Sequence, residues 1–116
     1  MFAWLLLSAG AATYAEPRQN GYQVGQVWEY RTRPEDAGSL LRIQKIEEIP
    51  ASAKVGPVYH ISVIGVHFGG SLAGAELQHL PVSRETLDAS VTRLSSSKAA
   101  FPDPSAGIAE WRSAKG

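Results

Sequence analysis

Three histidines, His60, His67 and His79, are the side chains best suited to proton transfer or metal binding near neutral pH. His60 and His67 are of opposite parity, so on one regular strand they point to opposite faces of a sheet. They would share a metal ion only across a bulge, and no carboxylate is obviously paired with either. We therefore predict no metal site and no cofactor. If the protein is a small hydrolase or isomerase, His60 or His79 would act as its general base.

Motifs for other kinds of catalysis are absent from the sequence. No Gly-x-Ser-x-Gly nucleophile elbow is present, and the glycine-rich residues 69–74 lack the Gly-Lys-Ser/Thr ending of a phosphate-binding loop. The adjacent carboxylates Glu35 and Asp36, and Glu47 and Glu48, are typical of a solvated turn and a strand edge. The chain has no cysteine, which excludes disulfides, thiol catalysis and thiolate metal sites. We predict no catalytic residues. The missing catalytic motifs and the missing cysteine favour a protein that is not an enzyme.

Aromatic and arginine side chains occur together in two strand-like segments, a composition typical of binding hot spots. Two interpretations are open. The aromatic residues are either core anchors of a small domain or part of a surface that contacts a ligand or partner. The candidate binding residues are Trp28, Tyr30, Arg31, Arg33, Tyr59 and His60.

Length and charge limit the possible partners. The 116 residues are 44% hydrophobic, which indicates one small folded domain with little room for a deep active-site cleft. Eleven basic and eleven acidic residues cancel and are scattered along the chain. Since no basic stripe can neutralise phosphates, we expect an unidentified protein or small ligand as partner, and no nucleic acid.

The first fifteen residues carry no charge and end in small side chains, as secretory signals do. Thr13 and Ala15 suit the −3 and −1 positions, which predicts cleavage between Ala15 and Glu16 and a periplasmic or secreted protein. Residues 9–11 form a second acceptable site. Because no basic residue precedes Arg18, two alternatives stay open: a misassigned start codon, which would make the protein cytoplasmic, and an apolar helix kept in the fold.

The chain divides into three parts. Residues 1–15 are the predicted signal peptide, which at about 22 Å of helix is too short for a stable span of a hydrocarbon core about 30 Å thick. Residues 16–22 are polar, contain Pro and Gly, and predict a flexible linker. Residues 23–116 form a single domain. Because Trp111 is large enough for a core and lies near the end, we expect the natural chain to continue beyond Gly116.

Alternating and β-branched segments predict the strands. Residues 23–32 place Val24, Trp28 and Tyr30 on one face, and a Pro- and Gly-containing turn follows. Residues 39–49 fit either a helix or a strand with a bulge near residues 44–45, and the strand is favoured. Residues 58–68 predict a central strand covered on both faces. Residues 76–80 predict a short fourth strand.

A helix entry signal follows these strands. Ser83 suits a helix cap, and Val82 can pack on Leu87 as a hydrophobic staple. Leu87, Val91 and Leu94 then share one helical face, and the serines at 95–97 end the helix. A partial second helix is expected around residues 108–111. The fold class is α+β: an antiparallel three- to four-stranded meander packed by one amphipathic helix and a partial second.

Three motifs suggest a relationship: GQVWEYRTRP at residues 25–34, YHISV at 59–63, and HLPVS at 79–83 followed by SVT at 90–92. Together they resemble a group of small bacterial proteins with no assigned function. The resemblance covers most of residues 23–111. In that group the chain continues past the region of Trp111 into another Gly-rich, strand-like stretch. The resemblance implies no catalytic or binding residue.

Three functional hypotheses follow. The first is a small non-catalytic domain of the bacterial envelope that binds a protein or small ligand. The second is an inhibitor or immunity-type partner that blocks a toxin or hydrolase, which suits the small size and neutral charge equally well. The third is a small hydrolase or isomerase with a histidine as general base.

Overall fold

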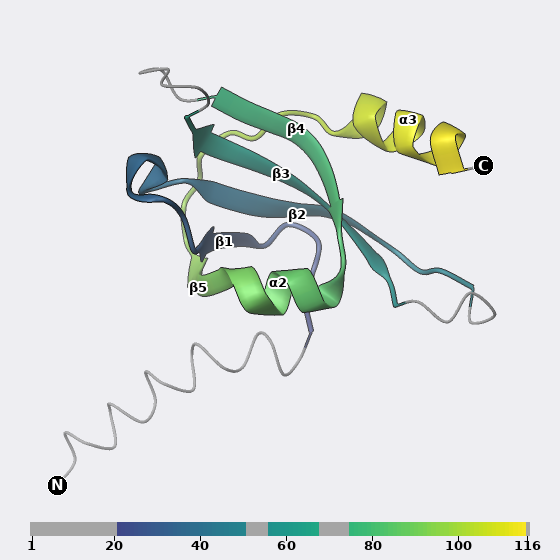
Figure 1. Cartoon of the computed structure of the whole chain (residues 1–116), viewed down its shortest axis with the longest axis horizontal. Helices are drawn as coiled ribbons and strands as arrows, with labels where there is room; N and C mark the ends of the chain where they lie inside the picture. The colour runs from purple at the N-terminus through teal and green to yellow at the C-terminus, as the bar shows by residue number, and fades with distance from the viewer. Residues whose placement is uncertain (1–20, 51–55, 68–74, 116) are drawn as a thin grey trace, which may run out of the picture.

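The computed structural model describes residues 21–50, 56–67 and 75–115. In these parts the chain forms one five-stranded antiparallel sheet and two α-helices (Figure 1). The predicted signal peptide with its cleavage site, most of the predicted linker, residues 68–74 and Gly116 lie outside the described residues. The elements are β1 (Val27–Tyr30), a 3-10 turn (Pro34–Asp36), β2 (Leu40–Glu47), β3 (Val58–Val66), β4 (Ala75–Val82), α2 (Arg84–Ser90), β5 (Val91–Ser95) and α3 (Ser105–Lys115).

The α+β class is confirmed, but the described sheet has more strands than predicted. Its order is β4-β3-β2-β1-β5. Strands β1 to β4 pair in chain order, and β5 then returns to pair with β1. The sheet is therefore a four-stranded meander extended by a fifth strand at its β1 edge.

The first strand is shorter than predicted because the chain turns before it. Gly25 has a φ of 96°, in the left-handed region that suits glycine, and it lies in a turn. This turn breaks the expected alternation, so the inward position predicted for Val24 is wrong: its side chain is 60% exposed. Trp28 does point inward and is fully buried. Tyr22, before the turn, packs against it edge-on at 5.6 Å between ring centroids.

The bulge predicted near residues 44–45 is confirmed. The pairing of β2 with β3 shifts register between Ile43 and Lys45. One extra residue on β2 allows Ile43 and Ile46 to face the same core although they are three positions apart. The sequence spacing that also fitted a helix is thus produced by a bulged strand.

Strand β3 is covered on both faces, as predicted. Tyr59, Ile61 and Val63 belong to the hydrophobic core. His60 and Ser62 point to the opposite face and are also fully buried. The sheet consequently has an apolar side and a side where buried polar groups need partners.

The predicted long helix is wrong beyond its first two turns. Its start is confirmed, since the Ser83 hydroxyl accepts the Thr86 amide at 3.1 Å and Leu87 is buried. The helix ends at Ser90, however, and Val91 and Leu94 lie in β5 instead. Val91 is β-branched and suits a strand, and β5 hydrogen-bonds to β1, a partner far away in sequence. Leu94 pairs with Trp28, beyond a register shift between Glu29 and Tyr30, and remains 38% exposed.

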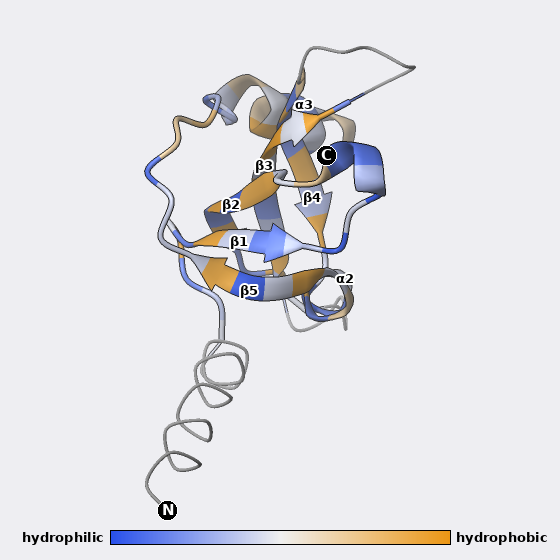
Figure 2. Cartoon of the chain, turned by 90° about the vertical axis from the view of Figure 1, so that its left-hand side faces the viewer, coloured by the Kyte–Doolittle hydropathy of each residue, from blue (hydrophilic) through white to orange (hydrophobic). Residues whose placement is uncertain are grey.

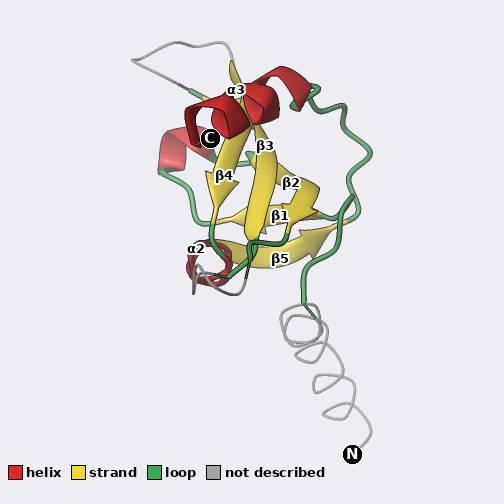
Figure 3. Cartoon of the chain, turned by 90° about the vertical axis from the view of Figure 1, so that its right-hand side faces the viewer, coloured by secondary structure: helices red, strands yellow, loops and turns green. Residues whose placement is uncertain are grey.

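Helix α3 covers the polar side of the sheet. It is 11 residues long, more than the partial turn expected. Asp103 begins it by accepting the Ser105 amide at 2.9 Å and the Ser105 hydroxyl at 2.6 Å. The two described helices therefore lie on opposite sides of the sheet, with α3 over β3 and β4 and α2 beside β5 (Figure 3).

The hydrophobic core lies between the sheet and α2. Hydrophobic residues are concentrated in the strands, as the orange segments of β2 and β3 show (Figure 2). In the described part of the chain, neither helix is long and apolar enough to cross a membrane. The buried members of the core are Tyr22, Trp28, Leu41, Ile43, Tyr59, Ile61, Val63, Val66, Leu87 and Val91.

Candidate functional site

Two histidines from neighbouring strands contact each other beneath α3. His60 on β3 is paired with Pro81 on β4, and His79 lies two residues before Pro81 on the same face. The Nδ1 atom of His60 lies 2.8 Å from the Nε2 atom of His79, and the two rings stack with centroids 5.0 Å apart. His60 is fully buried, whereas His79 is partly exposed. Antiparallel pairing thus brings together imidazoles 19 residues apart.

A carboxylate and an arginine extend this pair toward the surface. The Nε2 atom of His60 lies 3.2 Å from Oε1 of Glu47 at the end of β2. Arg112 of α3 donates to the same oxygen at 2.9 Å. Trp111 meets the His60 ring edge-on at 4.9 Å between centroids. Three strands and one helix therefore contribute to a cluster that we call the histidine cluster: Glu47, His60, His79, Trp111 and Arg112.

The environment keeps both imidazoles neutral. Burial lowers the pKa of His60 below its ordinary value, although Glu47 partly opposes this. Burial and the nearby His60 lower the pKa of His79. The hydrogen bond from Arg112 keeps the pKa of Glu47 below its ordinary value, despite partial burial. At neutral pH the cluster thus holds an ionised carboxylate and two uncharged rings.

These charge states define the direction of the hydrogen bonds. The Glu47 carboxylate only accepts, so His60 donates from Nε2. Neutral His60 must then accept at Nδ1, and His79 donates to it from Nε2. His79 is left with an acceptor lone pair at Nδ1. The cluster is therefore a chain of hydrogen bonds running from Glu47 to His79.

His79 lines an open cavity of about 420 Å³ between β4 and α3. A larger cavity of about 600 Å³ adjoins it, lined by the beginnings of β3 and α2 and the end of β4. Pro81 and Trp111 line both cavities. We call the two cavities together the Trp111 groove.

A glycine allows α3 to approach His79 closely. A Cβ atom at Gly107 would lie 2.5 Å from the Cβ of His79 and 2.9 Å from its Nδ1. No side chain fits at this distance, so the contact requires glycine. The sequence analysis did not single out Gly107, although a glycine within a helix is a signal of such close packing.

The predicted binding residues do not gather on one surface. Trp28 and Tyr59 belong to the core, with 0% and 4% exposure. The Trp28 indole donates to Gln26 Oε1 at 3.3 Å. Burial raises the pKa of Tyr59. Trp28 and Tyr59 are therefore core residues. Of the six predicted binding residues, His60 is the one that belongs to the histidine cluster.

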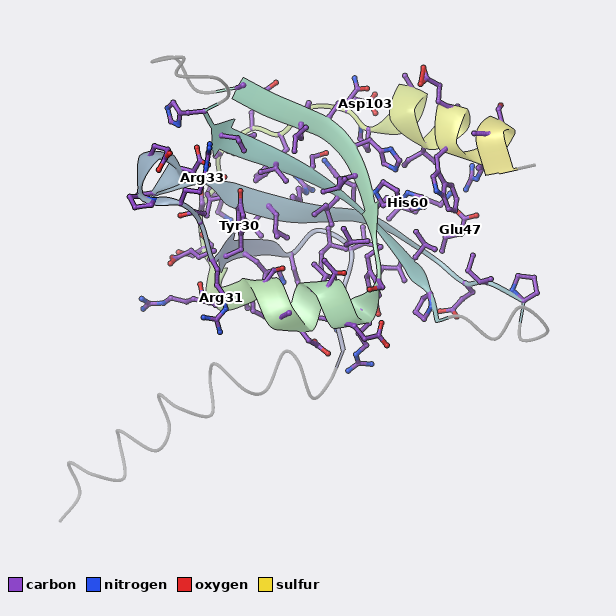
Figure 4. All side chains as sticks on the ribbon, in the orientation of Figure 1. Tyr30, Arg31, Arg33, Glu47, His60 and Asp103 are labelled. Carbon is purple, nitrogen blue, oxygen red and sulfur yellow. The ribbon has the colours of Figure 1, made fainter. Side chains whose placement is uncertain are left out.

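Tyr30, Arg31 and Arg33 lie at the other end of the sheet from His60 and Glu47 (Figure 4). The Tyr30 hydroxyl lies 2.8 Å from the Ser39 hydroxyl. Arg31 donates to the carbonyl of Ala89, near the end of α2, at 3.1 Å. These contacts tie loops and helix ends to the sheet.

Arg33 belongs to a second polar cluster around buried Asp36. Arg33 donates to Asp36 at 2.9 Å and to the His67 carbonyl at 2.6 Å. The His67 amide donates to Asp36 at 2.7 Å. Burial alone would raise the pKa of Asp36, but the hydrogen bonds from His67 and Arg33 outweigh it and lower that pKa. This cluster fixes the 3-10 turn against the end of β3.

Sequence reasoning missed the carboxylate partners of two histidines. Glu47 pairs with His60, and Asp36 pairs with His67, 13 and 31 residues away respectively. Strand register brings the first pair together and the packing of the 3-10 turn against the end of β3 brings the second together, and neither was available from local patterns. Within the described residues, no three His, Asp or Glu side chains group as a metal site.

Comparison of the chain with protein-family models, with curated proteins and with solved structures finds no match.

Proposed function

We propose that this protein is a small non-catalytic binding domain of the bacterial envelope that recognises its partner at the Trp111 groove. The observation that carries the proposal is that two cavities meet at one indole and one proline ring. Concave sites with aromatic walls and a few polar groups are where proteins commonly bind ligands. An inhibitor or immunity-type role is the form of this proposal in which the partner is a toxin or hydrolase.

The walls of the groove are held in place before any partner binds. Trp111 packs on the buried His60 ring, and the next residue, Arg112, binds Glu47 at 2.9 Å. Gly107 allows α3 to sit directly on His79. Binding to such a preformed site loses little conformational entropy, which favours recognition.

Export is the second part of the proposal and rests on residues 1–15. If it is right, the protein in fractionated native cells begins at Glu16 and is found in the periplasm. Mass spectrometry of that protein measures both properties. An uncleaved or leaderless form in the cytoplasm would remove the envelope from the proposal without touching the groove.

Fragment screening by NMR tests the groove. The indole Nε1–H signal of Trp111 and the amide signals of Val82 and Ser83 should move with bound fragments. The indole signal of Trp28 is an internal control, because its ring is fully buried and hydrogen-bonded to Gln26. Hits that leave Trp111 unchanged and move residues elsewhere would refute the groove as the binding site.

A histidine-dependent hydrolase or isomerase is the second candidate function, favoured by one observation. The hydrogen-bond chain from Glu47 ends at His79, which lines a cavity together with Glu110. An imidazole supported in this way can accept a proton from a bound substrate. A turnover found in an ester and epimerisation screen should disappear in both His79→Gln and His60→Gln variants. Turnover that survives both changes would exclude this role.

A further inference from the structure

We propose that the occupant of the Trp111 groove is a positively charged, extended peptide segment of a partner protein. This inference rests on the proposed binding function and adds the chemical class of the partner. The charges that line the groove, the shape of the groove and the contrast with the other side of α3 all favour such a partner.

The charge at the groove is negative on both sides of the indole. Glu85 lines the larger cavity and Glu110 lines the smaller one. Among the described residues that line either cavity, these are the charged side chains apart from His79, which is neutral at pH 7, and no Lys or Arg is present. Trp111 lies in both cavities and can hold a cation against its ring face. Acid, indole and acid thus follow one another along the groove.

The opposite side of α3 shows that this charge pattern is local. A cavity of about 390 Å³ there is lined by Lys45 and Arg112 and by no acidic side chain among the described residues. The chain as a whole has a net charge of zero. The groove therefore carries a concentration of negative charge that the average composition does not predict, and complementary charge speeds and orients binding.

The shape of the groove favours a peptide over a small cation. Each of the two cavities has one carboxylate, and they join at Pro81 and Trp111. Two basic side chains of one extended segment can occupy both, whereas one small cation occupies a single cavity. Pro81 has no amide hydrogen, although β4 is an edge strand of the described sheet. Side-chain contacts rather than strand addition must therefore dominate at this point.

Peptides of defined charge test the inference. We would titrate the full chain with hexa-arginine, hexa-glutamate and a glycine–serine hexapeptide at low salt, and follow the Trp111 indole signal. Hexa-arginine should bind and shift that signal, and the other two peptides should not. Binding should weaken as salt screens the charges.

Charge-removing variants locate the binding. Glu85 and Glu110 are exposed, so Glu85→Gln and Glu110→Gln should fold normally and each weaken hexa-arginine binding about two- to five-fold. Glu76→Gln is the matched control, because Glu76 is an exposed carboxylate on β4 that does not line the groove. Equal weakening by all three variants would show nonspecific attraction and overturn the inference.

Three further outcomes separate this inference from the proposed function. If neutral fragments shift Trp111 but hexa-arginine does not, the groove binds ligands and the cationic partner is wrong. If arginine amide alone binds as tightly as hexa-arginine, the occupant is a small cation and the peptide is wrong. If neither fragments nor peptides affect Trp111, the binding function fails as well.

Discussion

The Nδ1 atom of His60 and the Nε2 atom of His79 share one hydrogen bond of 2.8 Å, with no carboxylate between them. His60 is fully buried and already donates to Glu47 from its other nitrogen. A proton added to His60 at Nδ1 would therefore meet the N–H of His79, and the bond would be lost. A proton added to His79 enters at Nδ1 and leaves the bond in place.

Acidification should destabilise the protein in two steps. The pKa values of His60 and His79 are lowered by folding, so the unfolded chain binds more protons than the folded one below pH 6.5, the ordinary histidine pKa. The free energy of unfolding should fall as pH decreases from that value toward the folded pKa values. A second loss should begin below about pH 4.5, where protonation of Glu47 and then Asp36, both with lowered pKa, becomes favourable in the unfolded chain.

Urea unfolding at a series of pH values measures this effect. His79→Gln provides the control, because its amide can still donate to His60 but does not titrate. The variant should lose less stability than the natural chain between pH 7.5 and 5.5. A free energy of unfolding that stays constant across this range in the natural chain would contradict the neutral histidine pair.

Glu47 and Arg112 form one ion pair, but removing each partner should have different effects. Arg112 is about half exposed, so Arg112→Ala should cost no more than about 1 kcal/mol. Glu47→Ala leaves the buried N–H of His60 without its acceptor and should cost about 1–3 kcal/mol. Denaturant midpoints of the two variants measure the difference.

Glu47→Gln is the matched control for this comparison. Its amide oxygen can still accept from His60, so most of the stability lost in Glu47→Ala should return. Equal losses in Glu47→Ala, Glu47→Gln and Arg112→Ala would mean that the ion pair alone matters and that His60 does not depend on the carboxylate.

Gly107→Ala should loosen α3 from the sheet. Alanine favours a helix over glycine by about 1 kcal/mol, but its Cβ would lie 2.5 Å from the Cβ of His79. Such overpacking costs about 1–3 kcal/mol, so the melting temperature and the hydrogen-exchange protection of α3 should fall. Gly56→Ala is the control, since nothing lies within 4 Å of a Cβ there. Identical behaviour of the two variants would show that α3 does not rest on His79.

Trp28→Ala should unfold or nearly unfold the domain. The side chain is fully buried in the core, and truncation of a buried tryptophan costs about 3–5 kcal/mol. Val24→Ala, four residues earlier at an exposed position, should change stability by less than about 0.5 kcal/mol. Circular dichroism during urea unfolding compares the two. A folded and stable Trp28→Ala variant would return Trp28 to the list of surface residues.

Much of the local structure was predictable because it depends on neighbouring residues. The strand at β3, the bulge between Ile43 and Lys45 and the Ser83 cap all follow from side-chain patterns within a few positions. Where a short apolar pattern fitted both a helix and a strand, the sequence did not decide between the two elements. Leu87, Val91 and Leu94 fit a helix by spacing, yet pairing with β1 places two of them in β5.

The sequence by itself determined the α+β class and, because it contains no cysteine, excluded disulfides and thiol chemistry. Only the tertiary structure decided that Glu47, His60 and His79 form one hydrogen-bonded chain and that Trp111 and Arg112 close over it. The physical reason is strand register and helix docking. These depend on the packing of the whole core, so no local pattern specifies which distant polar groups meet.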